Sequence, residues 1–128
     1  MFKIKTVMST DVLTVTPNTD IYEAIRIMVD KNVTGLPVVN PDQTIAGVLS
    51  EKDVLALMVN AEDQPGRVAE YMTPNPVCFD QEDSVIDVAE CFIGKHFRRV
   101  PIVSEGKLVG ILSRRDIVRF ILHLRHKD

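Results

Sequence analysis

The 128-residue chain has no tryptophan, only two cysteines, and no long uninterrupted apolar run. Two cysteines, Cys78 and Cys91, are too few for a disulfide framework, and they do not form a Cys-x-x-Cys zinc pattern. No apolar stretch approaches the roughly 20 residues that a membrane-spanning helix needs. The first five residues, Met-Phe-Lys-Ile-Lys, lack the apolar region of a signal peptide. We therefore expect a cytoplasmic protein with no membrane partner and no bound metal.

Positive charge is also scarce. The 15 basic residues are outnumbered by 18 acidic ones, which gives a net charge of −3 and a pI near 5.6. General nucleic-acid binding requires a basic footprint, so we expect no nucleic-acid partner. The hydrophobic fraction of 45% excludes intrinsic disorder, and the length suits one compact module.

The abundant residues are those branched at Cβ, with 18 valines and 11 isoleucines. Such side chains favour strands, where their restricted χ1 angle packs well on a pleated surface. Other windows repeat with the period of a helix. The composition therefore predicts a mixed α and β fold.

The chain also repeats itself once. The segment 47–54, Gly-Val-Leu-Ser-Glu-Lys-Asp-Val, matches 110–117, Gly-Ile-Leu-Ser-Arg-Arg-Asp-Ile, at an offset of 63 residues. Earlier in each half the offset is 64, where Pro37 matches Pro101. The one-residue difference falls in turn-rich segments, where length changes are least costly. We interpret the chain as two tandem repeats, residues 1–60 and 68–128, joined by a linker over 61–67.

Each half predicts the order strand, helix, strand, strand, helix. The expected strands are residues 13–16, 36–39 and 45–49, and then 77–80, 100–103 and 108–112. The first helix of each half begins after an N-cap, Asp20 or Ser84, and the second begins after Ser50 or Ser113. A unit of about 60 residues has only a small core. We therefore expect the two repeats to pair about a pseudo-two-fold axis, with clefts between them.

This pattern resembles the cystathionine-β-synthase (CBS) domain pair, or Bateman module, from about Val7 to Phe120. The resemblance rests on Met8-Ser9 and Met72-Thr73, on segments 35–39 and 99–103, and most strongly on 47–53 and 110–116. It implies two repeats in one stand-alone module that binds adenosine ligands and forms a homodimer, either head-to-head or head-to-tail. It also implies regulation of an effector protein on another chain. AMP is the favoured ligand, with ADP, ATP and S-adenosylmethionine as alternatives.

The resemblance assigns ligand roles within each Ser-x-x-Asp segment. The aspartate would hold the ribose and the serine would lie near ribose and phosphate, which gives Ser113 with Asp116 and Ser50 with Asp53. A carboxylate suits a ribose because its two oxygens accept from neighbouring hydroxyls, and a helix N-terminus favours a phosphate. Arg98, Arg99, Arg115 and Lys52 would supply positive charge, and Ile111, Val12 and Leu13 would form an apolar slot for adenine. Thr34, the first-half counterpart of Arg98, and Val77 complete the expected site residues.

The two expected sites are not equally equipped. Arg98-Arg99 corresponds to Thr34-Gly35, and Arg114-Arg115 corresponds to Glu51-Lys52. Because Glu51 disfavours a phosphate, we expect the Asp116 site to be the occupied one.

Three other interpretations stay open. A Ser-x-x-Asp segment before an apolar run is also a helix-capping box, which a structural duplication would copy. The module would then be a structural dimerisation domain with empty clefts. The last helix favours a homodimer in either case, because it is apolar nearly all round. An enzyme is the least favoured interpretation, since neither Ser50 nor Ser113 has an activating histidine at a suitable position.

Overall fold

The computed structural model describes residues 2–60, 66–95 and 97–126, and it has the expected mixed α and β fold. The chain forms two compact units. We call residues 13–76 the continuous unit, and we call residues 1–12 together with 77–128 the split unit. The units therefore do not follow the sequence halves, because the first residues of each half belong to the unit built mainly from the other. Residues 61–65 of the expected linker lie outside the described residues.

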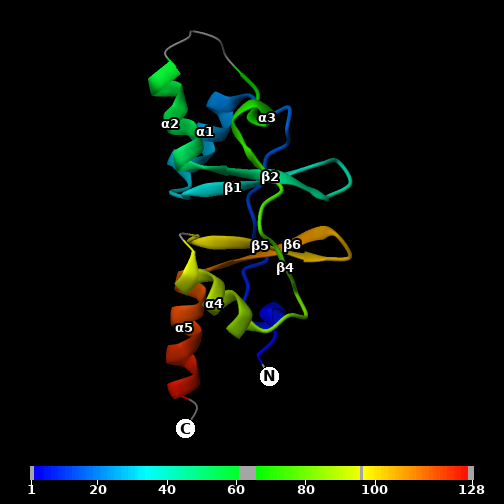
Figure 1. The fold of residues 1–128 in the computed structure, drawn as a ribbon, viewed down its shortest axis with the longest axis vertical. Coiled ribbons are helices and arrows are strands. Elements are labelled where there is room, and N and C mark those ends of the chain that lie inside the picture. The colour runs from blue at the N-terminus through cyan, green and yellow to red at the C-terminus, as the bar shows by residue number, and fades with distance from the viewer. Residues whose placement is uncertain (1, 61–65, 96, 127–128) are drawn as a thin grey trace. The chain divides into compact units, whose positions relative to one another are not determined.

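The continuous unit has a three-stranded antiparallel sheet with strand order β1-β2-β3 (Figure 1). Its strands are β1 (Gly35–Val39), β2 (Ile45–Ser50) and β3 (Thr73–Pro74). Its helices are α1 (Ile21–Asp30), α2 (Glu51–Asn60) and the short α3 (Val68–Tyr71). The Asp20 carboxylate caps α1 as the sequence predicts, because it accepts from the backbone N–H groups of Tyr22 and Glu23.

The split unit has the strand order β4-β5-β6, in which β4 runs parallel to β5. Its strands are β4 (Phe79–Asp80), β5 (Arg99–Ser104) and β6 (Lys107–Ser113). Its helices are α4 (Val85–Gly94), α5 (Arg114–Arg125) and a 3₁₀ turn, η1 (Ile4–Thr6). The Ser84 hydroxyl caps α4 by accepting from the N–H of Ile86, which confirms the predicted N-cap.

The first strand of each half is shorter than predicted. Of residues 13–16, only Val15 joins the sheet, where it bridges to Val38, while Leu13 is exposed. Of residues 77–80, only Phe79 and Asp80 form a strand, and Val77 is exposed. The apolar pattern was right for Val15 and Phe79, but a flanking proline, Pro17 or Pro76, has no N–H to extend the ladder.

We call residues 2–12 and 68–76, which open the two sequence halves, the leading segments. Equivalent backbone hydrogen bonds, which the sequence did not predict, anchor both of them. In the split unit the N–H of Ile4 donates to the carbonyl of Asp83 at 2.9 Å. In the continuous unit the N–H of Val68 donates to the carbonyl of Thr19, also at 2.9 Å. Both pairs are related by the 64-residue offset. In each unit, therefore, a segment from one sequence half completes a fold built mainly from the other.

A glycine lets each leading segment approach its sheet closely. A Cβ placed on Gly110 would lie 2.8 Å from the carbonyl oxygen of Ser9 and 2.6 Å from the sulfur of Met8. A Cβ on Gly47 would lie 2.7 Å from the carbonyl oxygen of Thr73 and 2.9 Å from the sulfur of Met72. Such distances leave no room for a side chain. The Gly and Met-Ser/Thr positions of the repeat are therefore partners in packing.

Each unit has its own apolar core, and the two cores use equivalent positions. The shared set comes from the first helix, the two long strands and the leading segment. In the continuous unit these residues are Ile21, Ala24, Met28, Leu36, Val38, Leu49 and Val68. In the split unit they are Val85, Val88, Phe92, Val100, Ile102, Leu112 and Ile4. This agreement supports the duplication inferred from the sequence.

The one-residue change of offset lies in the hairpin turn, as predicted. Between β5 and β6, Glu105 and Gly106 both have positive φ angles, 51° and 79°, as a two-residue hairpin turn requires. The turn between β1 and β2 is longer, and within it only Gln43 has a positive φ, 72°. Among the described residues, none of the helices combines the length and apolar character needed to cross a membrane.

Candidate functional site

Ser113 and Asp116 form a complete capping box at the start of α5. The N–H of Asp116 donates to Ser113 Oγ at 3.1 Å, and the N–H of Ser113 donates to Asp116 Oδ2 at 2.9 Å. This reciprocal arrangement satisfies two backbone groups that have no partner inside the helix. The capping interpretation of Ser-x-x-Asp is therefore confirmed for this segment. It uses one carboxylate oxygen and leaves the other for further contacts.

The second oxygen of Asp116 faces a basic side chain. Arg119 Nη1 lies 3.3 Å from Asp116 Oδ1, and the Asp116 side chain is only 16% exposed, whereas that of Arg119 is 67% exposed. The exposed guanidinium contributes little to stability because water screens the pair. A ligand hydroxyl can therefore replace Arg119 at Oδ1 without disturbing the cap on Oδ2.

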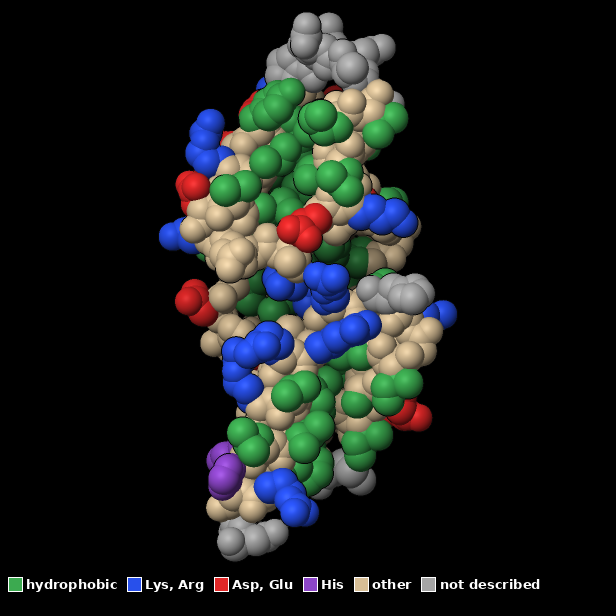
Figure 2. Space-filling model, turned by 90° about the vertical axis from the view of Figure 1, so that its left-hand side faces the viewer, with side chains coloured by type: hydrophobic (Ala, Val, Ile, Leu, Met, Phe, Trp, Pro, Cys, Tyr) green, Lys and Arg blue, Asp and Glu red, His purple; other side chains and the backbone are tan. Residues whose placement is uncertain are grey.

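The backbone of several basic residues lies close to this helix start. Arg99 lies opposite Ser113 in the pairing of β5 with β6, and the carbonyl of Arg98 accepts from the N–H of Arg114 at 3.0 Å. Arg115 is exposed in the first turn of α5. The expected residues Arg98, Arg99 and Arg115 are thus brought close to the Ser113 backbone. Basic side chains are also abundant on the face shown in Figure 2.

Arg114 has a structural task. Its Nε donates to the carbonyl of Phe97 at 2.8 Å, and its Nη2 donates to the carbonyls of Phe92 and Lys95 at 3.4 and 3.3 Å. These carbonyls lie at the end of α4 and in the segment after it. Arg114 therefore fixes the connection that leads into Arg98 and Arg99.

The equivalent site in the continuous unit has the same cap but different surroundings. The N–H of Ser50 donates to Asp53 Oδ2 at 2.9 Å, and the N–H of Asp53 donates to Ser50 Oγ at 3.3 Å. The Thr73 hydroxyl donates to Asp53 Oδ1 at 3.1 Å. Both oxygens of Asp53 therefore accept from neutral groups, whereas Oδ1 of Asp116 pairs with the charged Arg119.

The remaining expected residues divide between the units. Ile111 lies on β6 and exchanges backbone hydrogen bonds with Ser9, both at 2.9 Å. Val12 and Val77 belong to the split unit with Ile111, whereas Leu13 belongs to the continuous unit. Thr34 accepts from the N–H of Glu51 at 3.1 Å, the same role that Arg98 has in the split unit, and Lys52 is exposed beside Asp53. The adenine slot expected from Ile111, Val12 and Leu13 stays a prediction.

Sequence reasoning missed two residues that contact the aspartates, Thr73 and Arg119. Arg119 had a visible signal, because an opposite charge three residues after Asp116 lies on the same helix face. Thr73 is 20 residues from Asp53, and its hydroxyl became a partner only because β3 pairs with β2. Within the described ranges, no group of three or more histidine, cysteine or acidic side chains is placed to hold a metal ion.

Comparison with known proteins identifies the repeat. The sequence model for the CBS domain matches residues 4–60 and 68–123. The uncharacterised protein MJ1225 of Methanocaldococcus jannaschii is 32% identical over 118 residues, and CBSX2 of Arabidopsis thaliana, a chloroplastic CBS domain-containing protein, is 30% identical over 142 residues. These matches cover 92% and 88% of this chain but only 42% and 60% of the relatives.

Two solved structures are similar over nearly the whole chain. The structure of CBSX2 in complex with AMP superposes with a TM-score of 0.90 at 32% identity, covering 98% of this chain and 99% of that one. The CBS domain pair of MJ0100, in complex with methylthioadenosine and S-adenosylmethionine, gives a TM-score of 0.82 at 25% identity, covering 96% and 98%. The chain therefore has the fold of a CBS pair.

Proposed function

Because the chain belongs to the CBS domain family, we propose that it is a non-catalytic regulatory module that binds an adenosine ligand and signals its presence to an effector protein. The single observation that carries the proposal is that the two oxygens of the Asp116 carboxylate have different partners. One oxygen caps α5, while the other meets only an exposed arginine among the described contacts. That oxygen is suited to accept from a ribose hydroxyl.

The charge around Asp116 favours a ligand with at least one phosphate. Arg98, Arg99 and Arg115 lie around the N-terminus of α5, where the helix dipole and the first N–H groups also favour an anion. A guanidinium group can donate two parallel hydrogen bonds to the oxygens of one phosphate. AMP, as bound by CBSX2, is therefore the first ligand to test. S-adenosylmethionine, as bound by MJ0100, lacks a phosphate, so only its single carboxylate could pair with these arginines.

We also propose that the module is a homodimer that pairs through its helices. Exposed apolar side chains recur at equivalent positions in the two units: Val29 and Ile93, Leu55 and Val118, Met58 and Ile121, and Val59 and Leu122. Their exposed fractions range from 57% to 87%. Hydrophobic side chains gather over the helices of each unit (Figure 2). A duplicated apolar surface of this kind marks a protein interface.

The ligand proposal is tested by thermal unfolding and calorimetry with AMP, ADP, ATP and S-adenosylmethionine. A ligand that binds only the folded state raises Tm by an amount set by its concentration relative to Kd. Asp116→Asn is the decisive variant, because an asparagine oxygen can still accept from the Ser113 N–H but the carboxylate is lost. We expect it to weaken AMP binding about 10-fold or more, as for a lost hydrogen bond to a charged group.

Two matched variants interpret that result. Asp20→Asn alters the cap of α1 in the same way without touching the candidate site, so it should keep the full AMP effect. Asp53→Asn should weaken binding less than Asp116→Asn. Unchanged AMP affinity in Asp116→Asn would show that this carboxylate does not hold the ribose. No response to any of the four ligands at millimolar concentration would favour the structural dimerisation module instead.

A further inference from the structure

Asp53 and Asp116 have equivalent places in the two units but differ in how many donors they already meet. Asp53 Oδ2 accepts from the N–H of Ser50 at 2.9 Å and from its hydroxyl at 3.0 Å, and Oδ1 accepts from the Thr73 hydroxyl at 3.1 Å. An ionised carboxylate has about four acceptor positions. Neutral groups of the protein therefore fill three of these positions on Asp53 and leave one.

Asp116 keeps more of its acceptor positions for a ligand. Within the described part of the chain, it accepts from the N–H of Ser113 at 2.9 Å and from Arg119, whose side chain is 67% exposed, at 3.3 Å. When a ligand displaces that exposed guanidinium, roughly three acceptor positions are available. A ribose presents two neighbouring hydroxyl donors. Asp116 can therefore accept from both hydroxyls, whereas Asp53 can accept from only one.

The backbone holds Thr73 beside Asp53. Thr73 pairs with Val48 in the ladder between β2 and β3, and its carbonyl oxygen would lie 2.7 Å from a Cβ on Gly47. Close packing of this kind leaves the Thr73 backbone little freedom to move away from the sheet. The short threonine side chain therefore keeps its hydroxyl close to Asp53, whereas the long side chain of Arg119 can swing into solvent.

The split unit lacks this hydroxyl contact, although its backbone is arranged in the same way. Ser9, the residue equivalent to Thr73, bridges to Ile111 just as Thr73 pairs with Val48. For the residues that the structure describes, the contacts of Asp116 do not include the Ser9 hydroxyl. The contact between threonine and aspartate is therefore a property of the continuous unit and not of the duplicated fold.

We propose that Thr73 determines how many adenosine ligands the chain binds. Its hydroxyl occupies the Asp53 oxygen that a ribose would need, so the Asp53 site is closed and Asp116 is left as the single ligand site. This inference rests on the proposed function and goes beyond it, because it assigns the difference between the two sites to a hydroxyl as well as to the charge of Glu51. Removing that hydroxyl creates a second adenosine site at Asp53.

Calorimetry with adenosine tests this role, because adenosine has the ribose but no phosphate for Glu51 to repel. The full chain carrying Asp116→Asn is the parent, so that the Asp116 site contributes little to the binding measured. Adding Thr73→Ala should lower the Kd for adenosine about 5-fold or more, as for one hydrogen bond gained by a carboxylate. Thr73→Ser is the matched control, since it retains the hydroxyl, and it should bind like the parent. Adding Asp53→Asn to the Thr73→Ala chain should abolish the gain.

The unsubstituted chain, titrated with adenosine and AMP, separates the possible failures. If it binds either ligand but Thr73→Ala binds adenosine no more tightly than the parent, the proposed function stands and this role of Thr73 is overturned. Weaker binding after Thr73→Ala would also overturn it, because the threonine would then be a ligand contact. A gain that survives Asp53→Asn would overturn it by placing the new site elsewhere. If no chain binds either ligand, the proposed function fails and the role of Thr73 fails with it.

Discussion

The continuous and split units have the same backbone frame but present different chemistry at the start of their last helix. In both, a serine and an aspartate form a capping box, and a glycine receives a leading segment from the other sequence half. In the continuous unit the aspartate is held on both oxygens by serine and threonine. In the split unit one aspartate oxygen caps the helix and the other pairs with the exposed Arg119. Duplication has kept the groups that build the fold, while the charged residues at this helix start have diverged.

This contrast explains why a capping box and a ligand site are compatible. A cap needs only one carboxylate oxygen, and the same helix start supplies N–H groups and a dipole that favour a phosphate. What distinguishes the two units is the partner of the second oxygen. Thr73 is a neutral donor fixed by β3, whereas Arg119 is an exposed side chain that can move aside.

Among changes to this shared backbone frame, replacing its two closely packed glycines should cause the largest loss of stability. Gly110→Ala places a methyl group 2.8 Å from the Ser9 carbonyl oxygen, and we expect it to lower the free energy of unfolding by about 1–3 kcal/mol. Gly47→Ala should cost a similar amount, because the equivalent contact to Thr73 is 2.7 Å. Urea unfolding measures both.

Gly94→Ala is the control for these two variants. Gly94 is the last residue of α4, and a Cβ there would meet nothing within 4 Å. We expect a neutral effect or a gain of up to about 1 kcal/mol, because alanine favours a helix over glycine. If Gly110→Ala were as stable as Gly94→Ala, the close approach of the Met8-Ser9 segment would be contradicted.

A smaller loss of stability should distinguish the surroundings of Asp53 from those of Asp116. Thr73→Val keeps the shape of the side chain but removes the hydroxyl that donates to Asp53, and we expect a loss of about 0.5 kcal/mol because the bond is exposed. Ser9→Ala, at the equivalent position, should be close to neutral, since Ser9 is held through its backbone. Neither change should alter AMP binding at Asp116. An equal loss in both variants would show that the leading segments contact the aspartates alike.

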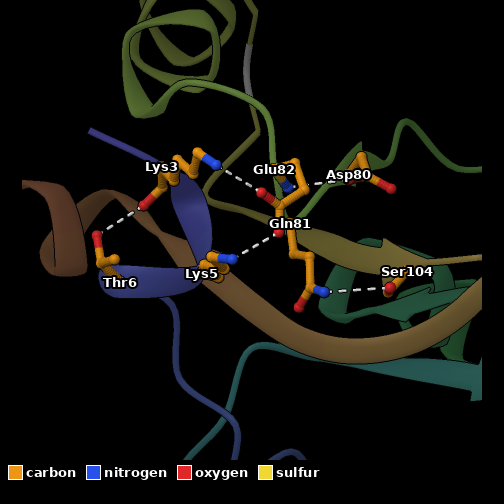
Figure 3. A network of polar contacts seen from close by, with 7 residues as sticks. All are labelled: Lys3, Lys5, Thr6, Asp80, Gln81, Glu82 and Ser104. Carbon is orange, nitrogen blue, oxygen red and sulfur yellow. Dashed lines mark hydrogen bonds and ion pairs between the residues drawn. The ribbon is translucent and has the colours of Figure 1, made fainter. Parts of the chain in front are cut away.

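The smallest expected effect concerns how the leading segments are anchored. In the split unit, the Glu82 carboxylate accepts from both Lys3 and Lys5 at 2.8 Å (Figure 3). These two lysines lower the pKa of Glu82 from 4.5 to about 2. In the continuous unit the equivalent residue is Asn18, whose carbonyl accepts from Arg67 at 2.9 Å. Only the split unit therefore has an anchor that titrates.

The sign of the pH effect follows from the lowered pKa. The ionised Glu82 stabilises the fold above pH 4.5, and this contribution is lost as the pH falls from 4.5 towards 2. Glu82→Gln should lower Tm slightly at pH 6, and the difference from the unsubstituted chain should vanish near pH 2. High salt should reduce the difference at pH 6, because the pair is exposed. A Tm difference that is independent of pH would contradict this account.

Much of the local structure was predictable from the sequence. The duplication, the helix starts at Asp20, Ser50, Ser84 and Ser113, and the hairpins with their one-residue difference in length were all identified correctly. These features depend on residues close together in the chain, such as a cap and the N–H groups two or three positions later. The capping interpretation of Ser-x-x-Asp was available for the same reason.

Only the tertiary structure decided how the pieces are combined. It placed Met8-Ser9 and Met72-Thr73 against the glycines of the other sequence half, brought Thr73 to Asp53, and limited the first strand of each half to one or two residues. Each of these outcomes depends on contacts between segments far apart in the chain. A pattern of neighbouring residues shows that a segment can pack or pair, but the partner is selected by the free energy of the whole fold.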